Sequence, residues 1–261
     1  MSFSQSFEQF IPREERTWNR LAVSLGMFIL GTIFASWASR IPDIKHFLNL
    51  SDAQLGFALF AAPIGQIPSM LVTPMLVKRF GSCSIVTTAM LCYPIMLVSL
   101  GFVQSVHQLF LVLISFGVFN SMLSISVNAQ AVGVENLYGR SIMAKFHGCW
   151  SLGGVIGGLF GGMMAGLGVS PRWHFVCILL LAFASANFAW RRLMKTDPLP
   201  NVAHTGLTRH RWMKPDILLV ILGIIGFGSM AVEGSMYDWN SVYFVSVLHE
   251  EGFSADRKSV V

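Results

Sequence analysis

Charged residues are scarce in this chain. Asp, Glu, Lys and Arg make up 12% of the 261 residues, about half the share that a soluble domain carries. Hydrophobic residues make up 54%, and the mean hydropathy is +0.61. This composition excludes an ordinary soluble protein and predicts an all-α integral membrane protein with several spans. The basic residues are scattered through short loops, so the net charge of +5 does not indicate a nucleic-acid partner.

Motifs for other kinds of chemistry are missing as well. The sequence has no Gly-x-x-x-x-Gly-Lys-Ser/Thr motif, which disfavours a self-contained ATP pump. It has no group of His, Asp and Glu with the spacing of a triad or a metal site, so we expect no enzyme, no catalytic residue, no metal and no cofactor. Four cysteines stand singly in or beside apolar runs, as small buried hydrophobic residues do. They are Cys83, Cys92, Cys149 and Cys177.

What the chain does have is a series of apolar segments near the length that spans a bilayer, about 20 residues each. Backbone groups in lipid must pair within their own segment, so each segment is predicted to be a helix. The seven predicted spans are residues 20–39, 53–77, 84–104, 107–131, 146–168, 173–190 and 215–236.

The basic residues predict the orientation. If the N-terminus is inside, thirteen Lys and Arg residues fall in the inside segments and three fall in the outside loops. The three are Arg40, Lys45 and Arg172. This bias predicts a cytoplasmic N-terminal tail at residues 1–19 and an outside C-terminus after seven spans. A seven-helix receptor has the opposite arrangement and is a poor alternative.

A long basic loop, residues 191–214, separates the sixth and seventh spans. It contains prolines, a glycine and much of the inside charge, as a linker between two bundles does. We therefore expect a six-helix bundle over residues 20–190, and the first helix of a second bundle over residues 215–255.

An internal repeat supports the second bundle. Trp37 precedes Ser51 by nearly the same distance as Trp239 precedes Ser254. Ser51 and Gln54 have the spacing of a capping box, which would open the second span. By the repeat, Ser254 would cap an eighth span. Parallel repeats about a linker build one large class of transporters with two six-helix halves. We therefore expect the second half to be incomplete here.

The last six residues, 256–261, begin with three charged side chains where an apolar run should start. A charge at the centre of a span costs about 2.5–3.5 kcal/mol on insertion scales. We therefore expect a non-native tail, produced by a sequencing artefact or a frameshift. A true stop after Val261 is the open alternative.

Three stretches carry a family resemblance. They are ASWASRIPDIK at residues 35–45, NAQAVGVENLYGRSIMAKFHGCWSLGGVIGG at 128–158 and EGSMYDWNSVYF at 233–244. With them the chain resembles permeases of the major facilitator superfamily, in a bacterial branch of uncharacterised permeases distantly akin to the sugar (fucose) permeases. The resemblance implies a twelve-helix transporter with a solute site between two halves. The chain would hold the N-terminal six-helix bundle and the seventh helix.

The loop between the second and third spans departs from the family pattern. That loop usually reads Gly-x-x-x-Asp-Arg-x-Gly-Arg, and here it reads PMLVKRFGS. Arg79 and Gly81 are kept, but Pro74 stands at the first glycine and Lys78 at the aspartate. The missing aspartate puts the family's cytoplasmic charge lock in doubt, but not the fold.

Polar groups at membrane depth are costly unless they meet a partner or a watery cavity, so they are the candidates for the transport pathway. Asn120, Ser124 and Asn128 are four residues apart and share one helical face. The resemblance implies that the first, fourth and seventh spans line the cavity. Hydrogen bonding between helices is the alternative for this stripe. Trp37 and Arg40 are further pathway candidates, although Arg40 could simply snorkel to the interface.

Three ionisable residues are candidates for proton coupling. Glu233 lies inside the seventh span and Asp238 near its outer end. Glu233 could instead form a structural ion pair with Arg40. His147 begins the fifth span and could relay a proton, or be a structural histidine at the membrane edge.

The fifth span carries two neighbouring glycine stripes. Every-fourth glycines let helices approach closely, so Gly154, Gly158 and Gly162 are predicted to pack against another helix. The adjacent stripe is Gly153, Gly157 and Gly161.

The sequence therefore predicts a partial copy of a secondary active transporter of the bacterial plasma (inner) membrane. It would work by alternating access on a small polar solute with proton coupling, and the fragment alone would be inactive. Its partners would be the lipid bilayer, the solute, the proton and the missing C-terminal half. A genuine seven-span sensor or interaction protein is the second hypothesis.

Overall fold

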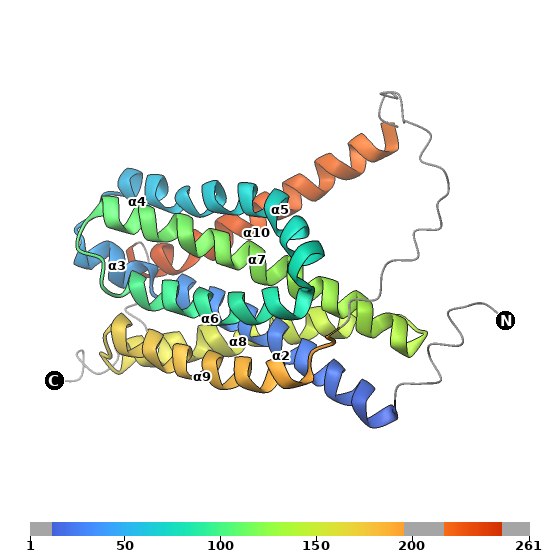
Figure 1. Cartoon of the computed structure of the whole chain (residues 1–261). Coiled ribbons are helices and arrows are strands. Elements are labelled where there is room, and N and C mark those ends of the chain that lie inside the picture. The colour runs from blue at the N-terminus through green and yellow to red at the C-terminus, as the bar shows by residue number, and fades with distance from the viewer. Residues whose placement is uncertain (1–11, 196–216, 247–261) are drawn as a thin grey trace.

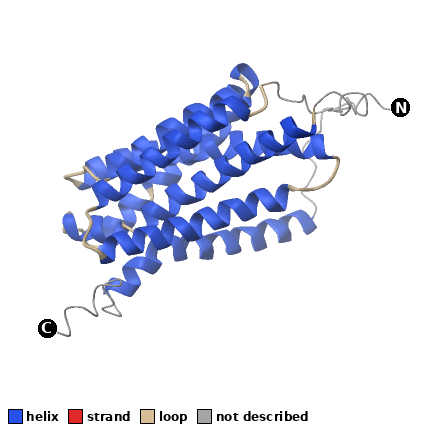
Figure 2. Ribbon diagram, turned by 90° about the horizontal axis from the view of Figure 1, so that it is seen from below, coloured by secondary structure: helices blue, strands red, loops and turns tan. Residues whose placement is uncertain are grey.

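A computed structural model of the chain describes residues 12–195 and 217–246. Within these residues the regular structure is entirely helical. The helices are α2 (Arg13–Ala38), α3 (Ile41–Phe47), α4 (Asp52–Leu59), α5 (Ala61–Phe80), α6 (Ser82–Leu100), α7 (Val106–Tyr138), α8 (Met143–Gly166), α9 (Pro171–Arg192) and α10 (Ile217–Ser246). Figure 1 shows them in chain order, and in Figure 2 the long helices run side by side along one direction. The predicted all-α fold is confirmed.

Seven segments of the described chain are long and apolar enough to cross a bilayer, as predicted. Their bounds are Glu14–Phe47, Asp52–Phe80, Ser82–Leu100, Val106–Tyr138, Met143–Gly166, Pro171–Arg192 and Ile217–Tyr243. Several run beyond the predicted ends. Hydropathy marks the part that can lie in lipid, whereas helical hydrogen bonding continues until a cap stops it.

The predicted capping box is confirmed at the start of α4. The Ser51 hydroxyl accepts a hydrogen bond from the Gln54 amide at 3.2 Å, and Gln54 Oε1 accepts one from the Ser51 amide at 3.0 Å. The second span then continues through Phe60 into α5, which contains three prolines, Pro63, Pro68 and Pro74. The expected cap at Ser254, the tail at 256–261 and most of the linker at 191–214 lie outside the described residues.

The bundle is built around α2. This helix packs most extensively against α8 and also contacts α9, α7 and α6. On the other side, α7 packs along both α5 and α6, and α6 also packs against α9. Helix α10 meets the bundle at α3 and α2 (Figure 1). The last span is therefore held mainly at one end of the molecule.

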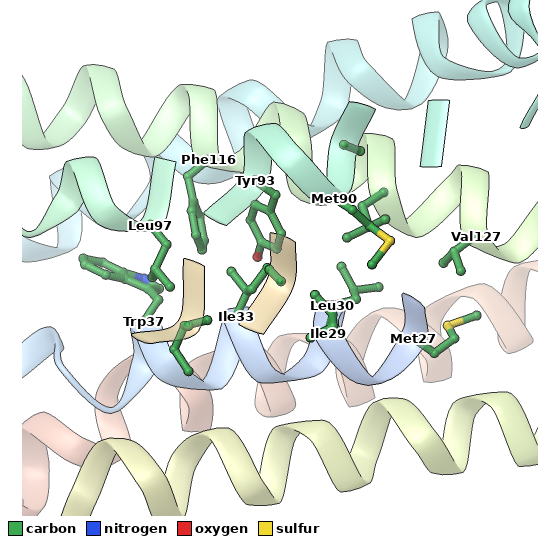
Figure 3. Packing of buried hydrophobic residues seen from close by; sticks show 14 of the residues in the cluster. Met27, Ile29, Leu30, Ile33, Trp37, Met90, Tyr93, Leu97, Phe116 and Val127 are labelled. Atoms are coloured by element: carbon green, nitrogen blue, oxygen red, sulfur yellow. The ribbon is translucent and has the colours of Figure 1, made fainter. Parts of the chain in front are cut away.

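Aromatic rings and branched aliphatic side chains fill the space between α2, α6 and α7 (Figure 3). The Phe116 ring centroid lies 4.6 Å from that of Tyr93 and 6.2 Å from that of Trp37. Ile33 of α2 is fully buried in the same cluster. Lipid tails are as apolar as these side chains, so close packing, rather than exclusion from water, stabilises this contact in a membrane.

Glycines bring the backbones of α2 and α8 together. A Cβ atom added to Gly157 would lie 2.6 Å from the Thr32 carbonyl oxygen, and one added to Gly153 would overlap the Phe28 carbonyl. The Thr32 hydroxyl also donates to the Gly153 carbonyl oxygen at 3.2 Å. The contact therefore depends on residues that leave room for a backbone.

The predicted packing stripe is the other one on this helix. A Cβ atom added to Gly154, Gly158 or Gly162 meets nothing within 4 Å among the described residues, so packing of that stripe stays a prediction. The packing stripe is its neighbour, Gly153, Gly157 and Gly161. Both stripes have four-residue spacing, so periodicity could not choose between them.

Candidate functional site

The polar stripe of α7 occupies one face of the longest helix. Asn120, Ser124 and Asn128 are all half-buried, whereas Phe116 and Val127 on the same helix are in the core. The Asn128 side-chain amide donates to the Ser124 carbonyl oxygen at 2.8 Å. This bond occupies one of its two amide N–H groups and leaves the side-chain oxygen for another donor. The stripe is thus a row of partly accessible polar groups along a membrane helix.

Trp37 and Arg40, predicted to lie on the transport pathway, are both buried. The Trp37 side chain is 3% exposed and packs in the apolar cluster beside Phe116 (Figure 3). In this structure the Trp37 ring packs between α2 and α7. A role for Trp37 on the transport pathway stays a prediction.

Arg40 stands at the junction of α2 and α3 and is 1% exposed. One guanidinium nitrogen, Nη2, donates to the Val169 carbonyl oxygen in the turn between α8 and α9. The Nε atom lies 3.2 Å from Asp43 Oδ2. The ion pair of Arg40 in the described chain is therefore with Asp43, and the suggested pair with Glu233 is not formed. Burial also excludes the snorkelling alternative.

The coupling candidates lie in different parts of the molecule. His147 is exposed in the first turns of α8. Glu233 and Asp238 are both half-buried on α10. Near Asp238, the Ser241 hydroxyl donates to the Ala38 carbonyl oxygen of α2 at 3.0 Å. The structure thus brings Asp238, but not His147, to the end of the bundle where α10 meets α2.

Around α10 the surface is hollowed. A depression of about 500 Å³ is lined by side chains of this helix alone. They are Ala231, Val232, Ser235, Met236, Trp239, Asn240 and Tyr243. The Trp239 ring also approaches Gly56 of α4, 3.5 Å from where a Cβ atom would stand. Because all of these residues belong to α10, the depression has no second wall among the described residues.

The loop motif between α5 and α6 is a tight turn. Gly81 is the only residue between the two helices and has φ 81°, a left-handed value that favours glycine. The Arg79 guanidinium lies 5.2 Å from the centre of the Phe80 ring. Gly81 therefore has a structural reason to be kept.

Two further polar residues, which the sequence analysis did not single out, are also deeply buried in the bundle. Gln130 of α7 donates to Ser82 Oγ at 2.6 Å and to the Met194 carbonyl oxygen at 2.8 Å, and accepts from the Met194 amide at 3.0 Å. His174 of α9 is 0% exposed. A histidine within an apolar run was the sequence signal for the second. No group of three or more His, Cys, Asp or Glu able to hold a metal occurs in the described ranges.

Comparison with known proteins agrees with this architecture. The chain is 28% identical over 230 residues to an uncharacterized MFS-type transporter of Yersinia pestis, covering 87% of this chain and 58% of that protein. It is 27% identical over 235 residues to an uncharacterized transporter of Sinorhizobium fredii, covering 88% and 60%. It is 27% identical over 229 residues to the membrane protein MosC of Rhizobium meliloti, covering 87% and 54%. The chain thus spans less than two thirds of each relative's length.

The sequence profile of the Major Facilitator Superfamily matches residues 20–256, which is most of the chain. The match runs from the first span through α10, and it agrees with the seven membrane-length helices and the glycine-mediated packing described above. The chain therefore belongs to the Major Facilitator Superfamily and is a multi-pass membrane protein.

Proposed function

We propose that this chain is the N-terminal six-helix bundle and seventh helix of a proton-coupled secondary transporter for a small polar solute. The transporter works by alternating access and resides in a bacterial inner membrane with its N-terminus in the cytoplasm. Family membership supports transport in general. The observation that carries the choice of solute is the polar stripe of α7.

The stripe supports a polar solute for an energetic reason. An amide that faces lipid without a hydrogen-bond partner costs several kcal/mol. Asn120 and Asn128 are nevertheless half-buried rather than sealed in the core. Amides can both donate and accept hydrogen bonds, so they suit a solute that carries hydroxyl or amide groups. Their partners on the other side would come from the second half of the protein.

Two carboxyl groups on α10 support proton coupling. Glu233 and Asp238 are half-buried carboxyl groups on a helix that is otherwise apolar and largely exposed. A carboxyl group at membrane depth is tolerated when it faces a partner or a water-filled path. Because α10 opens the second half in this proposal, a proton bound there lies at the boundary between the halves.

The test uses the full-length protein in liposomes that contain a pH-sensitive dye. A panel of sugars, polyols and amino acids is added outside. We expect at least one solute to drive proton movement. We expect Asn128→Ala to raise the solute concentration needed for half-maximal rate by about tenfold, because it removes one or two hydrogen bonds to the solute. Asn136→Ala, an exposed asparagine at the end of the same helix, is the matched control.

Two results would contradict the proposal. If no solute in the panel moves protons while an ionophore control shows sealed vesicles, proton-coupled transport of polar solutes is wrong. If Asn128→Ala and Asn136→Ala have equal effects, transport stands but the stripe is not its pathway.

A further inference from the structure

A buried histidine lies where α9 meets α2. His174 belongs to the first turn of α9, is 0% exposed, and neither ring nitrogen has a hydrogen-bond partner among the described residues. Its ring stands edge-on to Phe160 of α8 at 5.3 Å between centroids, and lies 5.4 Å from the Phe175 ring. An imidazole always carries at least one N–H donor, so leaving both nitrogens unpaired is costly.

Side chains are closely packed around His174, where α9 meets α8 and the end of α2; we call this contact the seam. A Cβ atom added to Gly161 of α8 would overlap the Ser39 hydroxyl of α2 and would lie 3.2 Å from His174 Cε1. The side chains of Ser39 and His174 therefore both lie against the backbone of α8 at Gly161. The His174 side chain is fully buried, and the depression along α10 does not include it. With so little room, a proton is the ligand that fits this nitrogen.

Charged groups near the imidazole come from one neighbour. Arg40, one residue beyond Ser39, lies within electrostatic range of His174, and its Nη1 atom also has no hydrogen-bond partner in the described part of the chain. The carboxylate of Asp43 partly neutralises the positive charge of Arg40, because Asp43 Oδ2 lies 3.2 Å from Arg40 Nε. Protonating His174 would add a second positive charge beside Arg40 in buried surroundings.

The other elements packed on α9 supply no compensating charge. Helix α6 has no charged residue, and the ionisable Lys145 and His147 of α8 lie at its opposite end. On α9 itself, Arg172 is positive and donates to the Gly101 carbonyl oxygen at 2.9 Å. On α2, which also packs against α9, the acidic Glu14 and Glu15 lie in the first turn, at the end opposite Arg40. Asp238 lies on α10, which contacts α2.

We propose that His174 is a proton-binding residue of the transporter, and that its protonated form loosens the contact of α9 with the α2–α3 junction. This inference rests on the proposed proton-coupled function and adds a second proton-binding residue, which lies outside α10. Repulsion from Arg40 is relieved when the seam opens and water reaches the imidazolium.

Opening the seam would act on the boundary with α10. Ser241 of α10 donates to the carbonyl oxygen of Ala38, two residues before Arg40. Arg40 also holds the turn between α8 and α9 through Val169. A displacement of Arg40 thus shifts the segment on which α10 rests, so protonation of a buried residue reaches the contact between the two halves.

The test measures access to the seam and needs no transport. The four native cysteines are replaced by alanine, and Ser36→Cys, fully buried one turn before Arg40, becomes the reporter in lipid nanodiscs. The labelling rate by a water-soluble maleimide is taken at pH 7.5 and pH 5.0, relative to Ser141→Cys, which reports an exposed site. This ratio removes the pH dependence of the thiol itself.

We expect the relative labelling rate of the reporter to rise about tenfold at pH 5.0, as when a minor open state becomes a major one. Adding His174→Gln abolishes the rise, because glutamine cannot be protonated. Adding His107→Gln, an exposed histidine in the first turn of α7, leaves the rise intact. Equal pH responses with and without His174 would overturn the proposal.

A second measurement keeps the proposal testable if His174→Gln does not fold. The unchanged chain is labelled with ¹⁵N-histidine, and the ring signals are followed by NMR between pH 8 and pH 4.5. A buried histidine signal that becomes protonated as the reporter opens supports the proposal, and one that stays neutral throughout contradicts it. Either result is independent of whether the full-length protein transports a solute.

Discussion

At the scale of single residues, adjacent glycines of α8 have opposite surroundings. A Cβ atom on Gly153 would overlap the Phe28 carbonyl of α2, whereas one on Gly154 would meet nothing within 4 Å in the described chain. Overpacking of this kind costs about 1–3 kcal/mol, while alanine otherwise favours a helix interior over glycine by up to about 1 kcal/mol. We therefore expect Gly153→Ala to lower the free energy of unfolding and Gly154→Ala to leave it unchanged or raise it.

This expectation is checked by measuring the melting temperatures of the two variants in detergent, with circular dichroism as the signal. A lower melting temperature for Gly154→Ala than for Gly153→Ala would show that the stripe facing α2 has been misidentified. Because both substitutions add the same methyl group to the same helix, differences in helix propensity cancel.

Gln130 gives a second residue-scale prediction. Its side chain joins α7 to the start of α6 and to the segment that follows α9. Gln130→Ala removes these bonds and leaves the Met194 amide and carbonyl unpaired, which costs about 1–3 kcal/mol. We expect a lower melting temperature than for Gln66→Ala, a half-buried glutamine of α5 for comparison. Equal melting temperatures would mean that water replaces the lost bonds.

At the scale of elements, helix ends are set by short-range chemistry. The capping box at Ser51 could be predicted because both of its bonds lie within four residues of sequence. The predicted fourth span stops at residue 131, whereas α7 continues to Tyr138 and is followed by Gly139 in a left-handed conformation. The apolar run marks where lipid can lie, and the left-handed glycine marks where the helix stops.

Removing the cap tests the start of α4. Ser51→Ala abolishes the bond to the Gln54 amide, and losses of this kind cost about 0.5–2 kcal/mol. We expect a lower melting temperature and faster amide exchange over residues 52–55. Ser99→Ala is the control, since that hydroxyl bonds to the Ile95 carbonyl within its own helix. Unchanged exchange at Gln54 would mean that solvent satisfies the amide equally well.

At the scale of the whole molecule, the charge bias predicts the orientation in the membrane. Single cysteines at Ser141, in the α7–α8 connection, and at Gln104, before α7, lie at opposite ends of one helix. With a cytoplasmic N-terminus, an impermeant thiol reagent added to intact spheroplasts labels Gln104→Cys and spares Ser141→Cys. The reverse pattern would contradict the proposed orientation.

The second whole-molecule prediction concerns activity. The chain covers 54–60% of the lengths of its relatives, and solute sites of such transporters lie between two repeats. We therefore expect the 261-residue chain in liposomes to show no saturable solute uptake, and the full-length protein to show it. Saturable uptake by the shorter chain would mean that one bundle suffices.

The sequence by itself determined the membrane class, the seven spans, the capping box and the family, because each depends on composition or on patterns within one segment. It could not decide which glycine stripe faces α2, that Trp37 fills the core, or that Arg40 pairs with Asp43 and binds the turn near His174. Those outcomes depend on how each helix is rotated about its axis. Packing against neighbours sets that rotation, and residues far apart in the chain supply the neighbours.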